Sequence, residues 1–464
     1  MNKGIRLKLF LMMVLQFFIW GAWLPLIFGY LPSLGFSATN PPPQLAFIAN
    51  NLPSWLAAFF SEQAMILNAF PIAAIVGMFF SNQFADRNFA AQRFLAFSHF
   101  IGGLAILSCG FARSFWAFYS LMLVHCLLYV PTISITNSIA FAAMKDAKQE
   151  FGIVRMGGTI GWILAAWPFT FIFVDWTAVN AANPHGLVAW IGEALSHPLT
   201  GAAAKAATKW TYIVSGVASL ALAAFSFTLP HTPAKKVESG ETKFAWLEAL
   251  RLLKHPFILV LWLVTLVDST VHNSYFMWTG SFLGTPVEKG GVGIASNWIM
   301  PVMSIGQIAE ILTMFVLGAT LKRLGWKWTM VFGILGHAAR FGVYAFFPQH
   351  AAMIILVQVL HGICYAFFFA TVYIFVEEFF PKDARSSAQG LFNVMILGVG
   401  ALIAATFCPG LFSAMTNQAG VTNFKSLFLI PFGCAVAGAI ILALFFHPPK
   451  STKATTGSGT APSH

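Results

Sequence analysis

Long apolar runs separated by short polar loops make up most of this chain. A run of about twenty residues is needed to cross the hydrocarbon core of a bilayer, and twelve runs reach that length. They form two sets of six. The runs cover 8–34, 63–85, 93–112, 114–142, 152–175 and 209–229, then 256–284, 295–321, 328–347, 350–378, 386–413 and 425–447. The pattern predicts an all-α membrane protein with twelve transmembrane helices.

A charge-rich stretch at 230–254 lies between the two sets and is the natural linker between two halves. We therefore predict an N-terminal six-helix half over 1–229 and a C-terminal six-helix half over 255–447. The tail 448–464 is rich in Ser, Thr and Gly, a composition typical of disorder, and we expect it to be a disordered cytoplasmic tail.

Composition supports the bilayer and excludes several other classes of protein. Hydrophobic residues make up 58% of the 464 residues and charged residues 9%, whereas a soluble domain is about a quarter charged. The net charge of +11 is spread over short loops rather than gathered on one basic face, so we expect no nucleic-acid partner. The five cysteines lie in or beside apolar runs without metal-ligand spacing. We expect no disulfide, metal or cofactor.

Orientation follows from the distribution of Lys and Arg over alternate loops, because cytoplasmic loops carry the excess. With a cytoplasmic N-terminus, 20 of the 26 Lys and Arg residues fall on the inner side. The exceptions are Arg113, Lys205, Lys209, Lys289, Arg340 and Lys425. We predict a multi-pass protein of the bacterial inner membrane with both termini cytoplasmic and the first apolar run retained as a span.

Polar side chains inside the spans are candidate functional residues, because burying them in lipid is costly. Arg155, Thr159 and Trp162 share one face of span 5, and Gly157, Gly158 and Gly161 allow another helix to approach it. The other polar candidates are Gln16, Trp20 and Trp23 in span 1, Asp268, His272, Asn273 and Phe276 in span 7, Gln307 and Glu310 in span 8, and His361 and Tyr365 in span 10.

Each candidate has a structural alternative. Arg155 could simply be the positive cytoplasmic end of span 5. Gln307 could form a hydrogen bond between helices, and Trp20 and Trp23 could serve only in packing. Glu310 is the hardest to explain structurally, since an unpaired carboxyl group in mid-span has few structural uses. Amides, a carboxyl group and aromatic rings around one cavity suit a neutral, flat solute with several hydrogen-bonding groups.

Two motifs carry a resemblance to the major facilitator superfamily. Residues 318–327 fit the loop that these transporters place between the second and third helices of each half, with Lys322 and Arg323 as its charges. The loop after span 2 is a degraded copy that keeps Asp86 and Arg87. The resemblance implies a 6+6 helix fold around a central cavity, with these four charged residues acting in conformational gating.

Further motifs resemble the nucleoside:proton symporter family of that superfamily. They begin at Leu15, Tyr129, Arg155, Met303 and Phe375 and follow the family's order from span 1 to span 11. The resemblance implies a substrate site made by Arg155, Thr159, Trp162, Asn273, Gln307, Glu310 and Tyr365, with His361 beside them. His361 replaces the family's tyrosine, Ala366 replaces its span 10 aspartate, and Phe276 stands at one of its polar positions in span 7.

The predicted function is proton-coupled uptake of a nucleoside by alternating access, carried out by a monomer in the lipid bilayer. Desolvation disfavours a charged carboxyl group, so Glu310 is the first candidate for the proton carrier and Asp268, beside His272, the second. A uniporter, or a facilitator carrier of a sugar or a nucleobase derivative, remains an alternative, as does a receptor that binds solute without flux. An enzyme is not expected, because the chain has no H-E-x-x-H or G-x-S-x-G motif.

Overall fold

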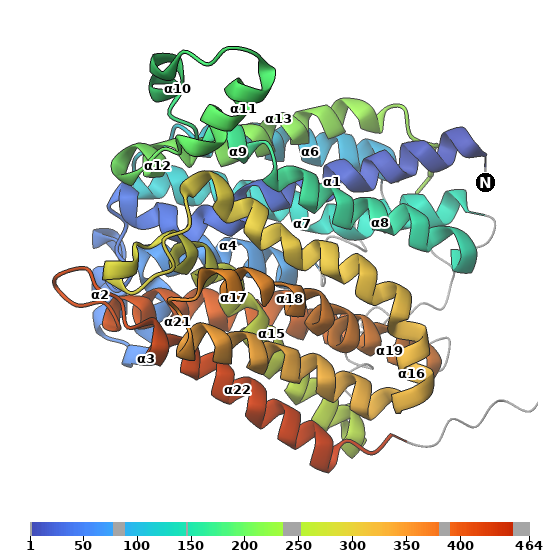
Figure 1. Cartoon of the computed structure of the whole chain (residues 1–464). Coiled ribbons are helices and arrows are strands. Elements are labelled where there is room, and N and C mark those ends of the chain that lie inside the picture. Colours follow the sequence, from blue (N-terminus) through green and yellow to red (C-terminus); the bar gives the residue numbers. More distant parts are fainter. Residues whose placement is uncertain (1, 78–88, 145–146, 235–251, 380–389, 449–464) are drawn as a thin grey trace, which may run out of the picture.

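The computed structural model describes residues 2–77, 89–144, 147–234, 252–379 and 390–448. Long helices lie side by side along most of the molecule (Figure 1), and the described residues contain no strand beyond two isolated β-bridges. Within these described ranges, seven helices are long and apolar enough to cross a membrane, or eight if a bent pair before Gly77 counts as one span. The all-α membrane class is confirmed, and the total of twelve spans stays a prediction.

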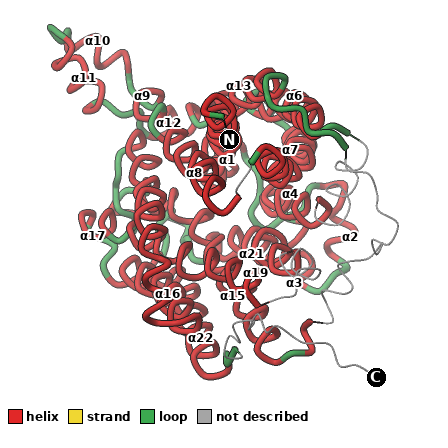
Figure 2. Tube along the Cα trace, turned by 90° about the vertical axis from the view of Figure 1, so that its right-hand side faces the viewer, coloured by secondary structure: helices red, strands yellow, loops and turns green. Residues whose placement is uncertain are grey.

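The first half of the chain supplies one group of mutually packed helices, seen end-on in Figure 2. Its members are α1 (Lys3–Tyr30), α4 (Glu62–Val76), α6 (Ala91–Cys109), α7 (Phe115–Ala143), α8 (Ala147–Ala166) and α13 (Lys209–Ser226). Glycines make the α1–α8 contact close, as predicted. A Cβ atom on Gly161 would lie 2.0 Å from the carbonyl oxygen of Val14, so only glycine fits there.

The second half supplies the other group, packed mainly within itself. Its members are α15 (Pro256–Gly284), α16 (Ser296–Phe346), α17 (Ala351–Leu356), α18 (Val359–Cys364), the π-helical η7 (Tyr365–Ala370), α19 (Thr371–Phe379), the π-helical η8 (Val394–Val399), α21 (Gly400–Ala414) and α22 (Phe424–Phe445). The domain boundaries at 229 and 255 stay predictions, since most of the linker lies outside the described residues.

Helix α16 contains both of the predicted spans 295–321 and 328–347, which the sequence separates into two. The backbone breaks at Gly325, whose φ of 70° and ψ of 177° are not helical, and glycine tolerates that positive φ without strain. Lys322 and Arg323 lie just before the break and are exposed. The motif's glycine thus lets the chain change direction after its two charges. Asp86 and Arg87 lie outside the described residues.

Two long loops sit at the end of the bundle where α1 finishes. The first carries α2 (Ala46–Asn50) and α3 (Ser54–Ala57). The second follows the short α9 (Phe169–Ile172) and carries α10 (Trp176–Ala182), α11 (Leu187–Ser196) and α12 (Gly201–Ala207), of which α10 and α11 project from the bundle in Figure 1. The second loop is tied to α16 by the Ser296 hydroxyl, which donates to the Leu199 carbonyl at 2.5 Å.

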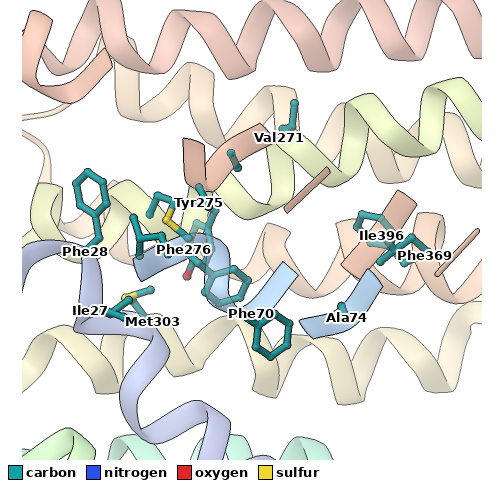
Figure 3. Packing of buried hydrophobic residues seen from close by; sticks show 14 of the residues in the cluster. Ile27, Phe28, Phe70, Ala74, Val271, Tyr275, Phe276, Met303, Phe369 and Ile396 are labelled. Atoms are coloured by element: carbon teal, nitrogen blue, oxygen red, sulfur yellow. The ribbon is translucent and has the colours of Figure 1, made fainter. Parts of the chain in front are cut away.

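The two helix groups meet along α1–α15, α4–α21 and α8–α16. Phe70 of α4 and Phe276 of α15 lie among the apolar side chains at this meeting in Figure 3. The Asn68 amide donates to the Thr406 hydroxyl at 3.0 Å, and Phe28 packs edge-on against Phe412 with ring centroids 5.4 Å apart. Both contacts lie toward the end of the bundle that carries the long loops, so they join the two helix groups there.

Removing the Asn68–Thr406 hydrogen bond should favour opening of that end. Hydrogen bonds between transmembrane helices contribute about 0.6 kcal/mol on average, so Thr406→Val should shift the equilibrium about threefold. Distances between spin labels on the loop ends of α4 and α21 measure the shift. Thr416→Val is the matched control, because the Thr416 hydroxyl bonds Thr422 within one helix group at 2.9 Å. An equal effect of both variants would contradict a gating role for the pair.

Candidate substrate cavity

A cavity of about 570 Å³ lies between the two helix groups. Small-molecule sites typically have volumes of about 300–1,000 Å³. Its walls come from α1, α4, α7 and α8 on one side and from α15, α16, α18, η7, α19, η8 and α21 on the other. All eight residues predicted to bind substrate line it: Arg155, Thr159, Trp162, Asn273, Gln307, Glu310, His361 and Tyr365. The structure therefore brings together residues from four of the predicted spans, the fifth, seventh, eighth and tenth, which lie far apart in the chain.

The α8 wall presents a positive charge and a hydroxyl group to the carboxyl group of α16. Arg155 and Thr159 are the polar partners of Glu310, and Arg155 also interacts with Tyr365. The Arg155 guanidinium lies 4.2 Å from the centre of the Phe17 ring, within range of a cation–π interaction. Arg155 is therefore more than the positive end of a span, because its charge faces the opposite helix group across the cavity.

Aromatic rings from both helix groups form a continuous wall. Trp20 stacks on Phe70 with ring centroids 4.7 Å apart and meets Trp162 edge-on at 5.2 Å. Trp162 in turn meets Phe276 of the other group at 5.8 Å. Such rings offer flat, apolar faces on which a planar base can stack. The wall crosses the interface, so relative movement of the groups would change its shape.

Three buried polar atoms around the cavity have no hydrogen-bond partner in the described part of the chain. They are the amide oxygen Oε1 of Gln307 and the indole nitrogens Nε1 of Trp20 and Trp23. A buried polar atom without a partner costs about 1–3 kcal/mol, so such atoms call for an explanation. One acceptor and two donors without partners, on residues that line the cavity, would be satisfied by a solute that supplies both donors and acceptors.

Gln16 does not lie with Trp20 and Trp23 at the cavity, although the sequence places all three among the candidate residues of span 1. The two tryptophans line the cavity, but Gln16 does not. Its amide donates to the Thr132 hydroxyl at 2.9 Å, and its Oε1 lies 2.9 Å from Nε2 of His99. Gln16 is thus fully buried and bonded within the first helix group. Its role is to hold helices together, which its position on a helix face could not reveal.

Asp268 lies behind the cavity wall, although His272, Asn273 and Phe276 of the same helix line the cavity. Its Oδ1 bonds Nδ1 of His337 at 2.8 Å, and Nε2 of His337 lies 3.4 Å from Nδ1 of His272. The predicted neighbours Asp268 and His272 are therefore linked through a histidine that the sequence analysis missed. Nothing in the local pattern of α16 singles out His337.

Arg340 was also missed as part of the site. It is fully buried, and its guanidinium donates to Nδ1 of His361 at 2.7 Å while lying 4.0 Å from the centre of the Tyr275 ring. Arginine always keeps its proton, so Nδ1 of His361 accepts and a neutral His361 carries its hydrogen on Nε2. The His361 ring lines the cavity, and in this tautomer it can donate a hydrogen bond through Nε2.

Irregular helix marks the cavity wall in span 10. The π-helical η7 carries Tyr365 and Phe369 on the wall, whereas Ala366 is fully buried and does not line it. π-helical turns within α-helices occur frequently at functional sites. Since Ala366 has no titratable group, Glu310 is the carboxyl group among the residues that line the cavity. Across the described residues no cluster of three or more His, Cys, Asp or Glu could hold a metal ion.

A family model described as "Nucleoside H+ symporter" matches residues 3–49, 48–197 and 182–451. The chain belongs to the nucleoside:proton symporter family. Among its relatives, the Escherichia coli protein YegT is 30% identical over 401 residues, covering 85% of this chain and 82% of YegT. The xanthosine permease of Escherichia coli is 25% identical over 471 residues, covering 98% of this chain and 99% of the permease.

The fold agrees with a solved structure of the same family. The crystal structure of the nucleoside transporter NupG has a TM-score of 0.73 and 23% sequence identity, over 97% of this chain and 100% of that one. The major facilitator fold expected from the sequence motifs is therefore confirmed. Membership of the symporter family makes the chain a multi-pass membrane transport protein, whose helix groups enclose the cavity described above.

Proposed function

We propose that this protein carries nucleosides across the membrane together with protons, by alternating access of the cavity between its two helix groups. One observation carries the proposal. The cavity walls combine stacked aromatic rings, free hydrogen-bonding atoms on Gln307, Trp20 and Trp23, and the Glu310 carboxyl group facing Arg155. Family membership supports the same substrate class.

Each kind of side chain in the cavity has a proposed binding role that follows from its chemistry. Trp20 and Trp162 stack against the planar base. Gln307 and Asn273 offer amide groups to the base, while Thr159, His361 and Tyr365 offer hydrogen bonds to its edge or to the sugar hydroxyls. Orientation thus comes from a few polar groups set in an apolar wall, which is how small-molecule sites are commonly built.

Glu310 is the proposed proton carrier. As a carboxylate it attracts Arg155 across the cavity, and this attraction joins α16 to α8. A proton that binds Glu310 neutralises the carboxylate and removes the attraction, so protonation and movement of the two helix groups become linked. Substrate bound to Gln307, one turn away on α16, enters the same equilibrium. Asp268, which lies behind the wall, is the second candidate.

The remaining proposals concern the orientation of the chain in the membrane, its moving halves and its gating charges. We propose that both termini are cytoplasmic, from the distribution of Lys and Arg, and that residues 1–229 and 255–447 are the moving halves of a monomer. Lys322 and Arg323, exposed next to the break at Gly325, are the proposed gating charges of the second half. Asp86 and Arg87 are their proposed counterparts in the first half.

Uptake of radiolabelled uridine and adenosine into proteoliposomes tests the proposal. With an inward proton gradient, both should accumulate above equilibrium, and a protonophore should abolish the accumulation. A gradient of one pH unit supports about tenfold accumulation if one proton moves with each nucleoside. Equilibration that ignores the gradient would indicate a uniporter. Absence of nucleoside flux would favour a different small polar solute, consistent with the His361–Arg340 pair in place of the family's tyrosine.

A further inference from the structure

A chain of three titratable side chains runs from the cavity wall into the second helix group. It begins at His272, which lines the cavity, continues through His337 and ends at Asp268. His337 is fully buried and Asp268 is 1% exposed. The second oxygen of the carboxyl group, Oδ2, has no hydrogen-bond partner among the described residues. Burying a carboxyl group with one oxygen unpaired costs free energy, so a purely structural role does not account well for Asp268.

The geometry fixes which nitrogens are engaged. His337 uses Nδ1 toward Asp268 and Nε2 toward His272, so both of its ring nitrogens lie in the chain. His272 uses Nδ1 toward His337, which leaves Nε2 on the edge of the ring available to the cavity. With the carboxylate as acceptor, each neutral imidazole donates its Nδ1–H inward. The nitrogen that His272 offers to a solute is then an acceptor.

We propose that Asp268, His337 and His272 form a proton-binding relay that opens on the cavity and reverses the hydrogen-bonding character of His272. A proton from the cavity binds Nε2 of His272, whose Nδ1–H passes to Nε2 of His337. The Nδ1–H of His337 then passes to Oδ1 of Asp268. One proton is taken up, both rings end neutral in the opposite tautomer, and the carboxyl group is protonated. His272 now presents an N–H donor to the solute.

The surroundings disfavour a positive charge on the His272 ring and favour movement of its proton inward, toward the Asp268 carboxylate. Arg340 of α16 carries a fixed positive charge beside His272 and His361, and like charges close together repel. Its Nε and one terminal nitrogen have no hydrogen-bond partner among the described residues. The other titratable groups that face the relay are Tyr275 of α15, His361 and Cys364 of α18, and Tyr365 of η7.

On the cavity side, Glu310 of α16 and Arg155 of α8 line the same walls as His272. The second-group elements α21, α22 and η8 add no charge to this cluster. Helix α22 packs on α15 and α16, and its single charged residue, Lys425, lies beside Phe346 at one end. Helix α21 and the π-helical η8 have no charged residue, and Cys408 of α21 contacts Ser274. Asp268 is therefore the acid that a proton entering from His272 reaches.

The relay deepens the proposed function, on which it rests, by giving nucleoside binding a pH dependence separate from that of Glu310. A donor on His272 suits the carbonyl acceptors of a base, so the protonated relay should bind uridine more tightly. In the Glu310→Gln variant, uridine affinity should rise about tenfold from pH 8.5 to pH 5.5. In Glu310→Gln/His337→Asn, which keeps a polar side chain but interrupts the relay, affinity should vary less than about twofold.

Equilibrium binding of radiolabelled uridine to the purified protein in detergent measures these affinities. His125→Asn is the matched control, because His125 is a buried histidine that bonds the Gly102 carbonyl in the first helix group. In the Glu310→Gln background it should leave the pH dependence intact. A pH dependence that survives in the double variant with His337→Asn would overturn the relay, as would its absence from Glu310→Gln alone.

Infrared difference spectra between acidic and alkaline pH provide a test that needs no nucleoside. The wild-type protein should show carbonyl stretches of buried protonated carboxyl groups from both Glu310 and Asp268. Asp268→Asn should lose one band that Glu310→Gln keeps. A spectrum unchanged by Asp268→Asn would show that no proton reaches the carboxylate and would refute the relay. A wild-type protein that shows the band but neither binds nor carries nucleosides would instead contradict the proposed function.

Discussion

Glu310→Gln should abolish proton-driven accumulation of nucleoside while exchange of nucleoside across the membrane continues. The amide resembles a permanently protonated carboxyl group, so the attraction to Arg155 is absent in every state of the carrier. The helix groups can then change orientation without moving a proton. The proton gradient therefore no longer drives accumulation of the nucleoside. With an inward gradient of one pH unit, accumulation should fall from about tenfold to about equal concentrations. Exchange at equal pH should stay within about threefold of wild type.

Glu62→Gln is the matched control for this experiment. Glu62 begins α4, and its carboxylate accepts the backbone N–H of Ser37 at 2.7 Å, away from the cavity lining. The same chemical change there should leave accumulation intact. If Glu310→Gln accumulates nucleoside as wild type does, Glu310 is not the proton carrier. Loss of exchange as well as accumulation would indicate that the carboxylate is needed for substrate binding itself.

The helices were predictable from the sequence because lipid imposes a simple rule on every span. A span must be apolar over about twenty residues and must satisfy its backbone hydrogen bonds internally. Breaks between helices were harder to predict. The chain around Gly325 reads as a loop between two spans, yet helix continues on both sides of one residue with positive φ. Length and composition do not determine such local geometry.

The cavity residues were predictable only in part from helix faces. The i, i+4, i+7 spacing placed Arg155, Thr159 and Trp162 on one face, and the structure confirms that this face lines the cavity. That α8 faces Glu310 of α16 came from family resemblance, since contacts between distant segments leave no periodic signal. The same reason explains why His337 was missed, since it lies 69 positions away from its partner Asp268, on another helix.

The π-helical segments show a third limit of sequence reasoning. Residues 365–370 read as an uninterrupted apolar helix, and the sequence carries no glycine or proline there to mark a change of geometry. In the structure the wider turn of η7 places Tyr365 and Phe369 on the cavity wall and leaves Ala366 buried behind it. One extra residue in a turn rotates every later side chain around the helix axis, so face assignments after such a turn become unreliable.

Gly362→Ala should disrupt the substrate site. A Cβ atom at Gly362 would lie 2.2 Å from the backbone nitrogen of Glu310 and 2.4 Å from the carbonyl carbon of Ala309. Both contacts are with backbone, so no side chain can rotate away. Helix α18 and helix α16 must separate, which moves Glu310 and Gln307 together. Overpacking of this kind typically costs about 1–3 kcal/mol, and uridine affinity should fall at least about tenfold.

Gly318→Ala on α16 separates this effect from a general intolerance of alanine. A Cβ atom at Gly318 meets no atom within 4 Å, and alanine is favoured over glycine in a helix by about 1 kcal/mol. Gly318→Ala should therefore keep wild-type affinity and melt at the same or a higher temperature. Measuring the melting temperature and uridine binding of both variants decides the matter. Wild-type affinity in Gly362→Ala would mean that α16 and α18 separate without moving the site, and that Glu310 does not depend on this contact for its position.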